Sequence, residues 1–276
     1  MILRTNSGPL YYELSGDGPP LVFVSGWAMS SECWRPAVAA LQKRHRCLTF
    51  DSRGITRSQP MSNNARFEIE DHADDLHAIL EFEGIFDAVM VGHELGSLIA
   101  TACADRHPQD ARSMILVSPR AVMRESEIRS LALFTPAALA LRELASYPLI
   151  RNVVAWRFRR APQPYRDRLF EDFADLNPRA AYETAVAASS KSPERIERWI
   201  SRNESPVLIV CGDRDQKSVT QARRLFATSR RGKIATMSDC GFLPMLEYPR
   251  QFARLIDDFI VKTQGIRRTG LSLRKR

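Results

Sequence analysis

Cysteine, histidine and long apolar runs are all scarce in this 276-residue chain. Its five cysteines are scattered and show no C-x-x-C spacing, which argues against a disulfide framework or a structural zinc site and favours reduced thiols. No apolar run at the N-terminus is long enough for a signal peptide. The most apolar later stretch, residues 131–150, contains Pro136, Arg142 and Glu143, so it is not a membrane span. We therefore expect a soluble, cytoplasmic protein.

Motifs for cofactors are missing as well. Neither G-x-G-x-x-G nor G-K-[ST] occurs, and no histidine or cysteine cluster has the spacing of metal ligands, so the sequence predicts no cofactor and no metal. The net charge is +8, and much of the excess lies at the C-terminal end. No aromatic residue alternates with the basic residues there, which argues against a nucleic-acid partner. We expect residues 265–276 to form a disordered basic tail.

Short apolar runs rich in β-formers alternate with helical patterns, within a composition that is 44% hydrophobic and 26% charged. Continuous apolar runs are typical of strands buried on both faces. Helices are predicted over residues 69–82 and 97–105. The predicted strands are Leu21–Val24, Cys47–Phe50, Ala88–Val91, Met114–Val117, Val207–Val210 and Ile234–Met237. This alternation predicts an α/β fold, with a mostly parallel twisted sheet and helices on both faces.

The alternation stops after the fourth predicted strand. The pattern of residues 120–202 predicts helices and loops, with Pro136, Pro148, Pro162, Pro164 and Pro178 as helix breakers. The strand pattern then resumes at Val207. We therefore predict a helical lid over residues 120–202, inserted into a core made of residues 1–119 and 203–264.

Unusual residues follow the carboxyl ends of the predicted strands, where ligands bind in open α/β sheets. The loops concerned are SGWA at 25–28, DSRG at 51–54, GHELG at 92–96, CGDRD at 211–215 and DCGFLP at 239–244. In the third loop, an apolar strand enters a turn framed by Gly92 and Gly96, and a helical pattern begins at once. This is the pattern of a nucleophile elbow, but the residue at its tip is Glu94.

Together these loops resemble the α/β-hydrolase superfamily, and within it small carboxylesterases of the pimeloyl carrier-protein methyl ester type. The matching stretches are SGWAMSSECW, DSRGITRS, GHELGS, CGDRD and DCGFLPMLEYP, and the resemblance covers residues 8–118 and 203–263. It implies an α/β-hydrolase fold with a Ser-His-Asp triad. In this chain Glu94 takes the place of the serine, Phe242 takes the place of the histidine, and Asp215 matches the acid.

The resemblance also implies the rest of the site. It places the two backbone donors of an oxyanion hole at Trp27 and Leu95. No histidine occurs after residue 107, and His93 is expected to have a structural role and to point away from the triad position. The expected substrate pocket around Glu94 consists of Ser25, Gly26, Trp27, His93, Phe242 and Leu243.

Three hypotheses for the function follow. With no imidazole between them, Glu94 and Asp215 would share a proton, and such a pair can do general acid–base work. We favour an enzyme in which Glu94 catalyses a non-hydrolytic lyase, isomerase or cyclase reaction on a small apolar carbonyl or acyl compound. Two alternatives stay open: a non-catalytic protein that binds a ligand or a partner, and a residual esterase in which Glu94 activates water. A covalent ester on Glu94 is disfavoured because Phe242 cannot activate the water that would release it.

Overall fold

The fold is built on one sheet of eight strands, in the order β1-β2-β4-β3-β5-β6-β7-β8. The computed structural model describes residues 1–60, 64–119, 155, 158–190 and 192–272, so residues 120–154 of the predicted lid lie outside the described part. Strands β3 to β8 pair in parallel, whereas β2 is antiparallel to both of its neighbours. The strands are β1 (Ile2–Thr5), β2 (Gly8–Ser15), β3 (Pro20–Val24), β4 (Arg46–Phe50), β5 (Ala88–His93), β6 (Ala111–Val117), β7 (Val207–Gly212) and β8 (Gly232–Met237). The predicted α/β class and mostly parallel sheet are confirmed.

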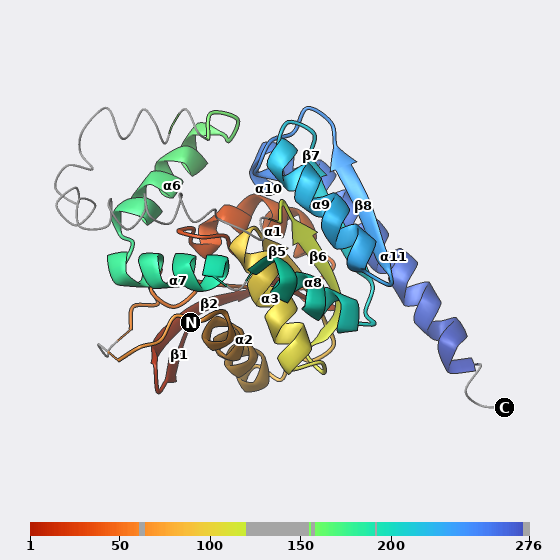
Figure 1. Ribbon diagram of the computed structural model, residues 1–276, viewed down its shortest axis with the longest axis horizontal. Coiled ribbons are helices and arrows are strands. Elements are labelled where there is room, and N and C mark those ends of the chain that lie inside the picture. Colours follow the sequence, from red (N-terminus) through yellow and green to blue (C-terminus); the bar gives the residue numbers. More distant parts are fainter. Residues whose placement is uncertain (61–63, 120–154, 156–157, 191, 273–276) are drawn as a thin grey trace.

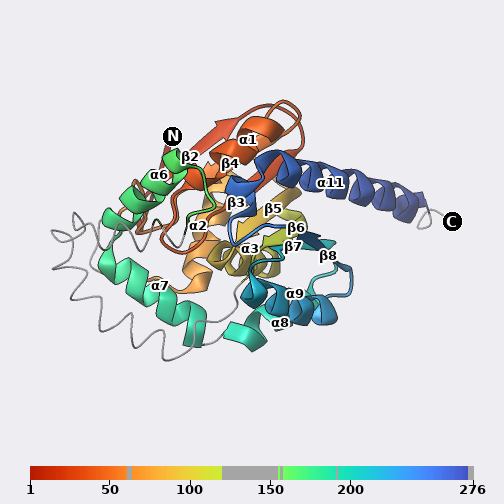
Figure 2. The ribbon, with the colours of Figure 1, turned by 90° about the horizontal axis from the view of Figure 1, so that it is seen from above.

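Helices cover both faces of the sheet (Figures 1 and 2). They are α1 (Arg35–Leu41), α2 (Ile69–Phe82), α3 (Leu95–Arg106), α6 (Gln163–Ala174), α7 (Pro178–Ser190), α8 (Ser192–Arg202), α9 (Gln216–Thr228), α10 (Pro244–Glu247) and α11 (Pro249–Ser272). Successive strand residues face opposite layers: Val22 belongs to the apolar layer that contains residues of α2, α3, α8 and α9, while Leu21 and Phe23 belong to the layer that contains residues of α1, α10 and α11. Both layers are apolar, which is why the strands read as continuous apolar runs.

The helices between β6 and β7 take two different positions. Helix α8 packs in the same apolar layer as α3 and α9, through Ile196 and Trp199. Helices α6 and α7 instead reach the loops after β3 and β4, because Ser30 bonds to α6 and Gly54 accepts a hydrogen bond from Asn177, just before α7. We call α6 and α7 the insert helices. The sequence pattern grouped α8 with them in the predicted lid, although α8 covers the sheet.

The C-terminal helix α11 continues as far as Ser272 and projects beyond the sheet (Figures 1 and 2). It therefore enters the segment 265–276 for which the sequence predicted disorder, and residues 273–276 lie outside the described part. Across the described residues, no helix combines the length and the apolar character needed to cross a membrane.

Candidate functional site

Glu94 lies at a sharp turn between β5 and α3. Its backbone has φ 49° and ψ −111°, a region that residues other than glycine rarely adopt. A Cβ on Gly92 would lie 2.3 Å from the carbonyl oxygen of Gly96, and one on Gly96 would lie 2.1 Å from that of Val24. Both glycines are thus required by close backbone contacts. The predicted strand–turn–helix elbow is present, with Glu94 at its tip, at the carboxyl end of β5.

The Glu94 carboxylate bonds to the loop after β3. Its Oε2 atom accepts a hydrogen bond from the backbone N–H of Trp27, with an N···O distance of 3.0 Å. Gly26 makes room for this contact, because a Cβ there would lie 3.1 Å from Glu94 Oε2 and 2.7 Å from His93 Nδ1. Trp27, Gly26, His93 and Glu94 are therefore brought together. The Trp27 amide, one of the two predicted oxyanion donors, is bonded to Glu94 itself. The other predicted donor, Leu95, is the first residue of α3.

His93 is fully buried between two loops of the site. Its Nε2 atom lies 2.9 Å from the carbonyl oxygen of Phe242, and its Nδ1 atom faces Gly26. A carbonyl oxygen can only accept a hydrogen bond, so Nε2 carries the proton. The His93 and Phe242 ring centroids are 4.6 Å apart. The imidazole thus fixes the Phe242 loop to the elbow.

Phe242 and Leu243 are both buried, and the Phe242 ring lies beside this imidazole. Their loop is held by Glu247 of α10, whose carboxylate accepts hydrogen bonds from the Gly241 amide at 2.8 Å and the Leu243 amide at 3.2 Å. The sequence analysis did not single out Glu247. Its position, four residues after Leu243 and at the end of a short helix that starts with proline, is the signal that could have identified it.

Asp215 is placed at the N-terminus of α9, where it accepts hydrogen bonds from the hydroxyl and the backbone amide of Ser218. It also lines a cavity of about 200 Å³ that it shares with the Phe242 loop and with residues before α6. Arg160, from the latter segment, bonds to the carboxylate of Asp239 at 2.9 Å, and Arg214 bonds to the same carboxylate at 3.2 Å. The proton-sharing pair of Glu94 and Asp215 stays a prediction.

The loop containing Trp27 is held by further polar groups, of which Ser25 was expected in the pocket and Asp172 was not singled out from the sequence. The Ser25 hydroxyl donates to the carbonyl oxygen of Ser30 at 3.1 Å. Asp172 of α6 accepts from the Ser30 amide and hydroxyl, and Asp51 accepts from the Ser31 amide. Burial favours a raised pKa for Asp51, but hydrogen bonds from Arg57, Ser31 and Thr56 outweigh it and hold the pKa below its usual value.

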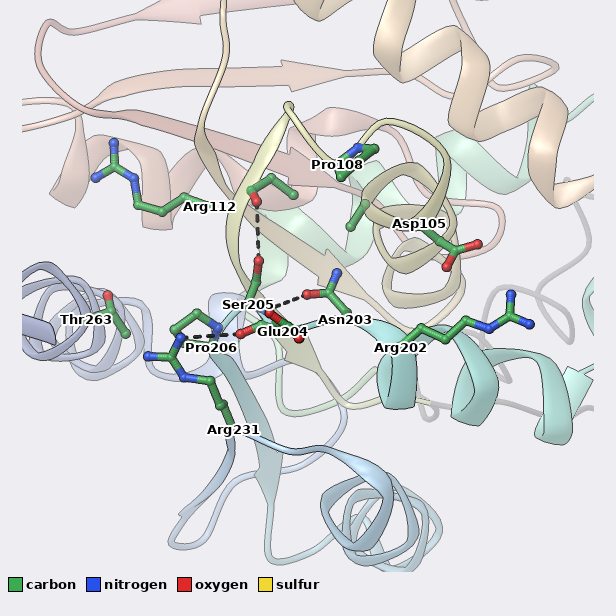
Figure 3. Close-up of a pocket in the computed structure, with 12 residues that line it drawn as sticks. Asp105, Pro108, Arg112, Arg202, Asn203, Glu204, Ser205, Pro206, Arg231 and Thr263 are labelled. Atoms are coloured by element: carbon green, nitrogen blue, oxygen red, sulfur yellow. Dashed lines mark hydrogen bonds between the residues drawn. The ribbon is translucent and has the colours of Figure 1, made fainter. Parts of the chain in front are cut away.

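A second and larger cavity, of about 370 Å³, lies near the amino ends of β6 and β7, at the end of the strands opposite to the elbow (Figure 3). Three arginines line it, but their side chains point in different directions (Figure 3). Arg112 is paired with Asp87 at 3.0 Å, and Arg231 donates to the carbonyl oxygen of Glu204 at 3.3 Å. The cavity lies at the amino ends of these strands, whereas the elbow lies at the carboxyl end of β5. Within the described residues, no cluster of three or more histidine, cysteine, aspartate or glutamate side chains could hold a metal ion.

Comparisons with known proteins agree with this architecture. The family model described as "alpha/beta hydrolase fold" matches residues 19–247. The chain is 32% identical over 109 residues to "Putative carbamate hydrolase RutD" of Azorhizobium caulinodans, covering 40% of each protein. It is 32% identical over 106 residues to "Pimeloyl-[acyl-carrier protein] methyl ester esterase" of Aeromonas hydrophila, covering 38% of this chain and 40% of that protein. The aligned region is therefore well under two thirds of these relatives.

Solved structures match over almost the whole chain. An esterase from Thermogutta terrifontis superimposes with a TM-score of 0.76 at 20% identity, covering 95% of this chain and 98% of that one. An enol-lactonase from Burkholderia xenovorans gives a TM-score of 0.79 at 20% identity, covering 95% and 100%. At this level of identity the likeness concerns the fold. The eight-stranded sheet, the turn at Glu94 and the match to the family model over residues 19–247 lead to one conclusion: the chain belongs to the α/β-hydrolase-fold family.

Proposed function

We propose that this protein is an enzyme in which Glu94, at the position of a hydrolase nucleophile, transfers protons to and from a small carbonyl or acyl compound. The observation that carries the proposal is the 3.0 Å hydrogen bond from the Trp27 amide to Glu94 Oε2. Glu94 adopts its backbone conformation at an expected cost of about 1–3 kcal/mol, and strained residues of this kind concentrate at functional sites. One carboxylate oxygen is anchored, which restricts the direction of the other.

The same hydrogen bond argues against ester hydrolysis through an oxyanion. The amide of Trp27 would have to stabilise the developing negative charge of a tetrahedral intermediate. With Glu94 ionised on that amide, an oxyanion about 4 Å away would be repelled by about 4 kcal/mol at an effective dielectric constant of 20. A reaction in which the carboxylate removes or returns a proton avoids this repulsion. Lyase, isomerase and cyclase chemistry all fall in this class, and Phe242 and Leu243 supply an apolar wall.

A hydrolase in which Glu94 activates water is the second candidate. It is favoured by the relatives, whose printed names are those of a carbamate hydrolase and a methyl ester esterase. The two candidates differ in what must happen at Trp27, because hydrolysis requires its amide to be released from Glu94 and proton transfer does not. They also differ in products, which makes them separable by experiment.

The test compares Glu94→Gln with the wild-type protein. Glutamine keeps an acceptor for the Trp27 amide but cannot take up a proton. Deuterium incorporation from heavy water into a panel of simple ketones and acyl thioesters is measured by NMR, alongside hydrolysis of p-nitrophenyl butyrate. We expect the wild-type protein to catalyse exchange and Glu94→Gln to lower the exchange rate by about 100- to 10,000-fold. Ester hydrolysis should stay at the background rate in both proteins. Asp105→Asn, at the far end of α3, is the matched control and should behave as wild type.

Two outcomes contradict the proposal. Ester hydrolysis that depends on Glu94, without exchange, would establish the water-activating hydrolase instead. If neither assay shows turnover that depends on Glu94, the proposal is overturned and the ligand-binding alternative remains.

A further inference from the structure

The loop of residues 25–30, which we call the Trp27 loop, is held at two points by the insert helices. The indole Nε1 of Trp27 donates a 3.0 Å hydrogen bond to the carbonyl oxygen of Ala181 on α7. At the end of the loop, Asp172 Oδ2 on α6 accepts from the Ser30 amide at 2.8 Å and from the Ser30 hydroxyl at 2.6 Å. The same loop carries the amide that holds Glu94. The insert helices are thus two hydrogen bonds away from the Glu94 carboxylate.

Asp172 is the stronger of these two anchors. Its side chain is fully buried, and its other oxygen accepts a 3.0 Å hydrogen bond from Arg168, one turn earlier on α6. Burial raises the pKa of Asp172, and the two hydrogen bonds from Ser30 oppose that rise. A buried carboxylate is costly unless donors surround it, so Asp172 and Ser30 hold each other in place. Helix α6 therefore cannot shift along the Trp27 loop without breaking these hydrogen bonds.

The Trp27 loop is short and internally closed. Ser25 donates from its hydroxyl to the Ser30 carbonyl at 3.1 Å, and the Met29 amide donates to the Gly26 carbonyl at 3.3 Å. Ala28 adopts φ 59°, which leaves the loop few alternative conformations. A displacement at Ser30 is therefore passed on to the Trp27 amide. N–H···O hydrogen bonds span about 2.7–3.2 Å, so a shift of a few tenths of an ångström at that amide takes the 3.0 Å bond to Glu94 out of this range.

We propose that Asp172 is a positioning residue for Glu94, acting through Ser30 and the Trp27 amide. This inference rests on the proposed role of Glu94 and extends it, since it makes the proton affinity of the Glu94 carboxylate depend on where α6 lies. A substrate that contacts the insert helices would then adjust the group that reacts with it. Asp172 itself need not contact the substrate.

The test observes the Trp27 amide directly and needs no substrate. The chain contains four tryptophans, so selective ¹⁵N-tryptophan labelling gives a small set of signals, and Trp27→Phe assigns the one required. The amide shift of Trp27 is followed against pH in the full-length protein, together with its hydrogen-exchange rate. In the wild-type protein we expect the shift to titrate with Glu94, and the titration to disappear in Glu94→Gln.

Asp172→Ala should move the midpoint of that titration by about half a pH unit or more. It should also speed exchange of the Trp27 amide by about tenfold. Asp172→Asn can keep a carbonyl oxygen at the Oδ2 position and should restore most of the wild-type behaviour. Glu171→Ala is the matched control, because Glu171 is the neighbouring carboxylate on α6 and pairs only with Arg168 among the ion pairs of the described residues. It should leave the midpoint unchanged. If Asp172→Ala does not fold, Ser30→Ala removes one hydrogen bond of the same clamp and should give a smaller shift in the same direction.

The two proposals fail in different ways. If the Trp27 amide does not titrate in the wild-type protein, or still titrates in Glu94→Gln, the role of Glu94 is refuted. If it titrates through Glu94 but keeps its midpoint in Asp172→Ala and Ser30→Ala, only the positioning role of Asp172 is overturned.

Discussion

Two neighbouring aspartates on α2 provide a matched test of buried against exposed charge. Asp75 pairs with Arg53 through two hydrogen bonds of 2.6 Å, and the side chains are only 5% and 10% exposed. Asp74 pairs with Arg106 through two bonds of 2.8 and 2.9 Å, but those side chains are 45% and 41% exposed. The geometry of the two pairs is nearly the same. They differ in access to water, and Asp74 also lies 3.0 Å from His107 Nε2.

We predict that Arg53→Met lowers the free energy of unfolding by about 3–5 kcal/mol, because it leaves a buried carboxylate without its partner. Arg53 also donates to the carbonyl oxygens of Arg66 and Asp71, at 2.8 and 2.9 Å, and both lose that donor. Arg106→Met should cost about 1 kcal/mol or less, because water replaces the lost partner. The double variant Arg53→Met with Asp75→Leu should recover part of the loss, since no unpaired charge remains buried.

Urea unfolding followed by circular dichroism at pH 7 measures all of these differences. Burial raises the pKa of Asp75 in the folded protein while Arg53 lowers it, so removing Arg53 raises it further. The folded variant then favours the protonated carboxyl, and its deficit relative to wild type should shrink as the pH falls towards 4. If Arg53→Met and Arg106→Met are equally destabilised, to within about 0.5 kcal/mol, then burial does not control the energy of these pairs and our reasoning is wrong.

Three further outcomes are expected. Burial, with a smaller contribution from Arg53, lowers the pKa of His72 to about 3. Below pH 7 the unfolded chain therefore binds a proton at His72 that the folded protein does not bind. Wild-type stability should therefore fall by about 2 kcal/mol more than that of His72→Gln between pH 7 and pH 5 in urea titrations, and equal slopes would contradict this. Gly96→Ala should lower stability by about 3 kcal/mol or more, because its Cβ would lie 2.1 Å from the Val24 carbonyl oxygen, whereas Gly84→Ala, with open space and φ 62°, should cost only about 1 kcal/mol in the same assay. All five cysteines are buried, and burial raises the pKa of Cys240 to about 12, so a thiol reagent such as DTNB should label none of them at pH 8 until denaturant is added; rapid labelling of the native protein would show that the core opens.

The sequence predicted the sheet well where a strand is buried on both faces, because such a strand appears as a continuous apolar run. All six predicted strands are present, five of them predicted from continuous apolar runs, and α2 begins and ends at the predicted residues. The hairpin of β1 and β2 was missed, because β2 alternates buried and half-buried residues at the antiparallel edge and has no continuous apolar run. The pattern also could not separate α8, which covers the sheet, from the insert helices α6 and α7. All three are amphipathic helices that follow β6 in the chain.

The elbow was predictable because its cause is local. Two glycines and an apolar strand before a helix are enough to specify the turn at Glu94, and the loops that meet there follow from the rule that parallel strands end at one edge. What the carboxylate does at that edge was not predictable. The resemblance implied an oxyanion-hole donor at the Trp27 amide, and the structure adds that this amide bonds to Glu94.

The amino-acid sequence by itself determined the class of the fold, the order of its buried strands and the position of an acidic residue at a strained turn. Only the tertiary structure decided which groups contact that residue. The Trp27 amide is 67 residues from Glu94, and Ser30 is 142 residues from Asp172. Contacts over such separations are set by how helices pack on loops, because hydrogen bonds between distant segments leave no periodic trace in the chain.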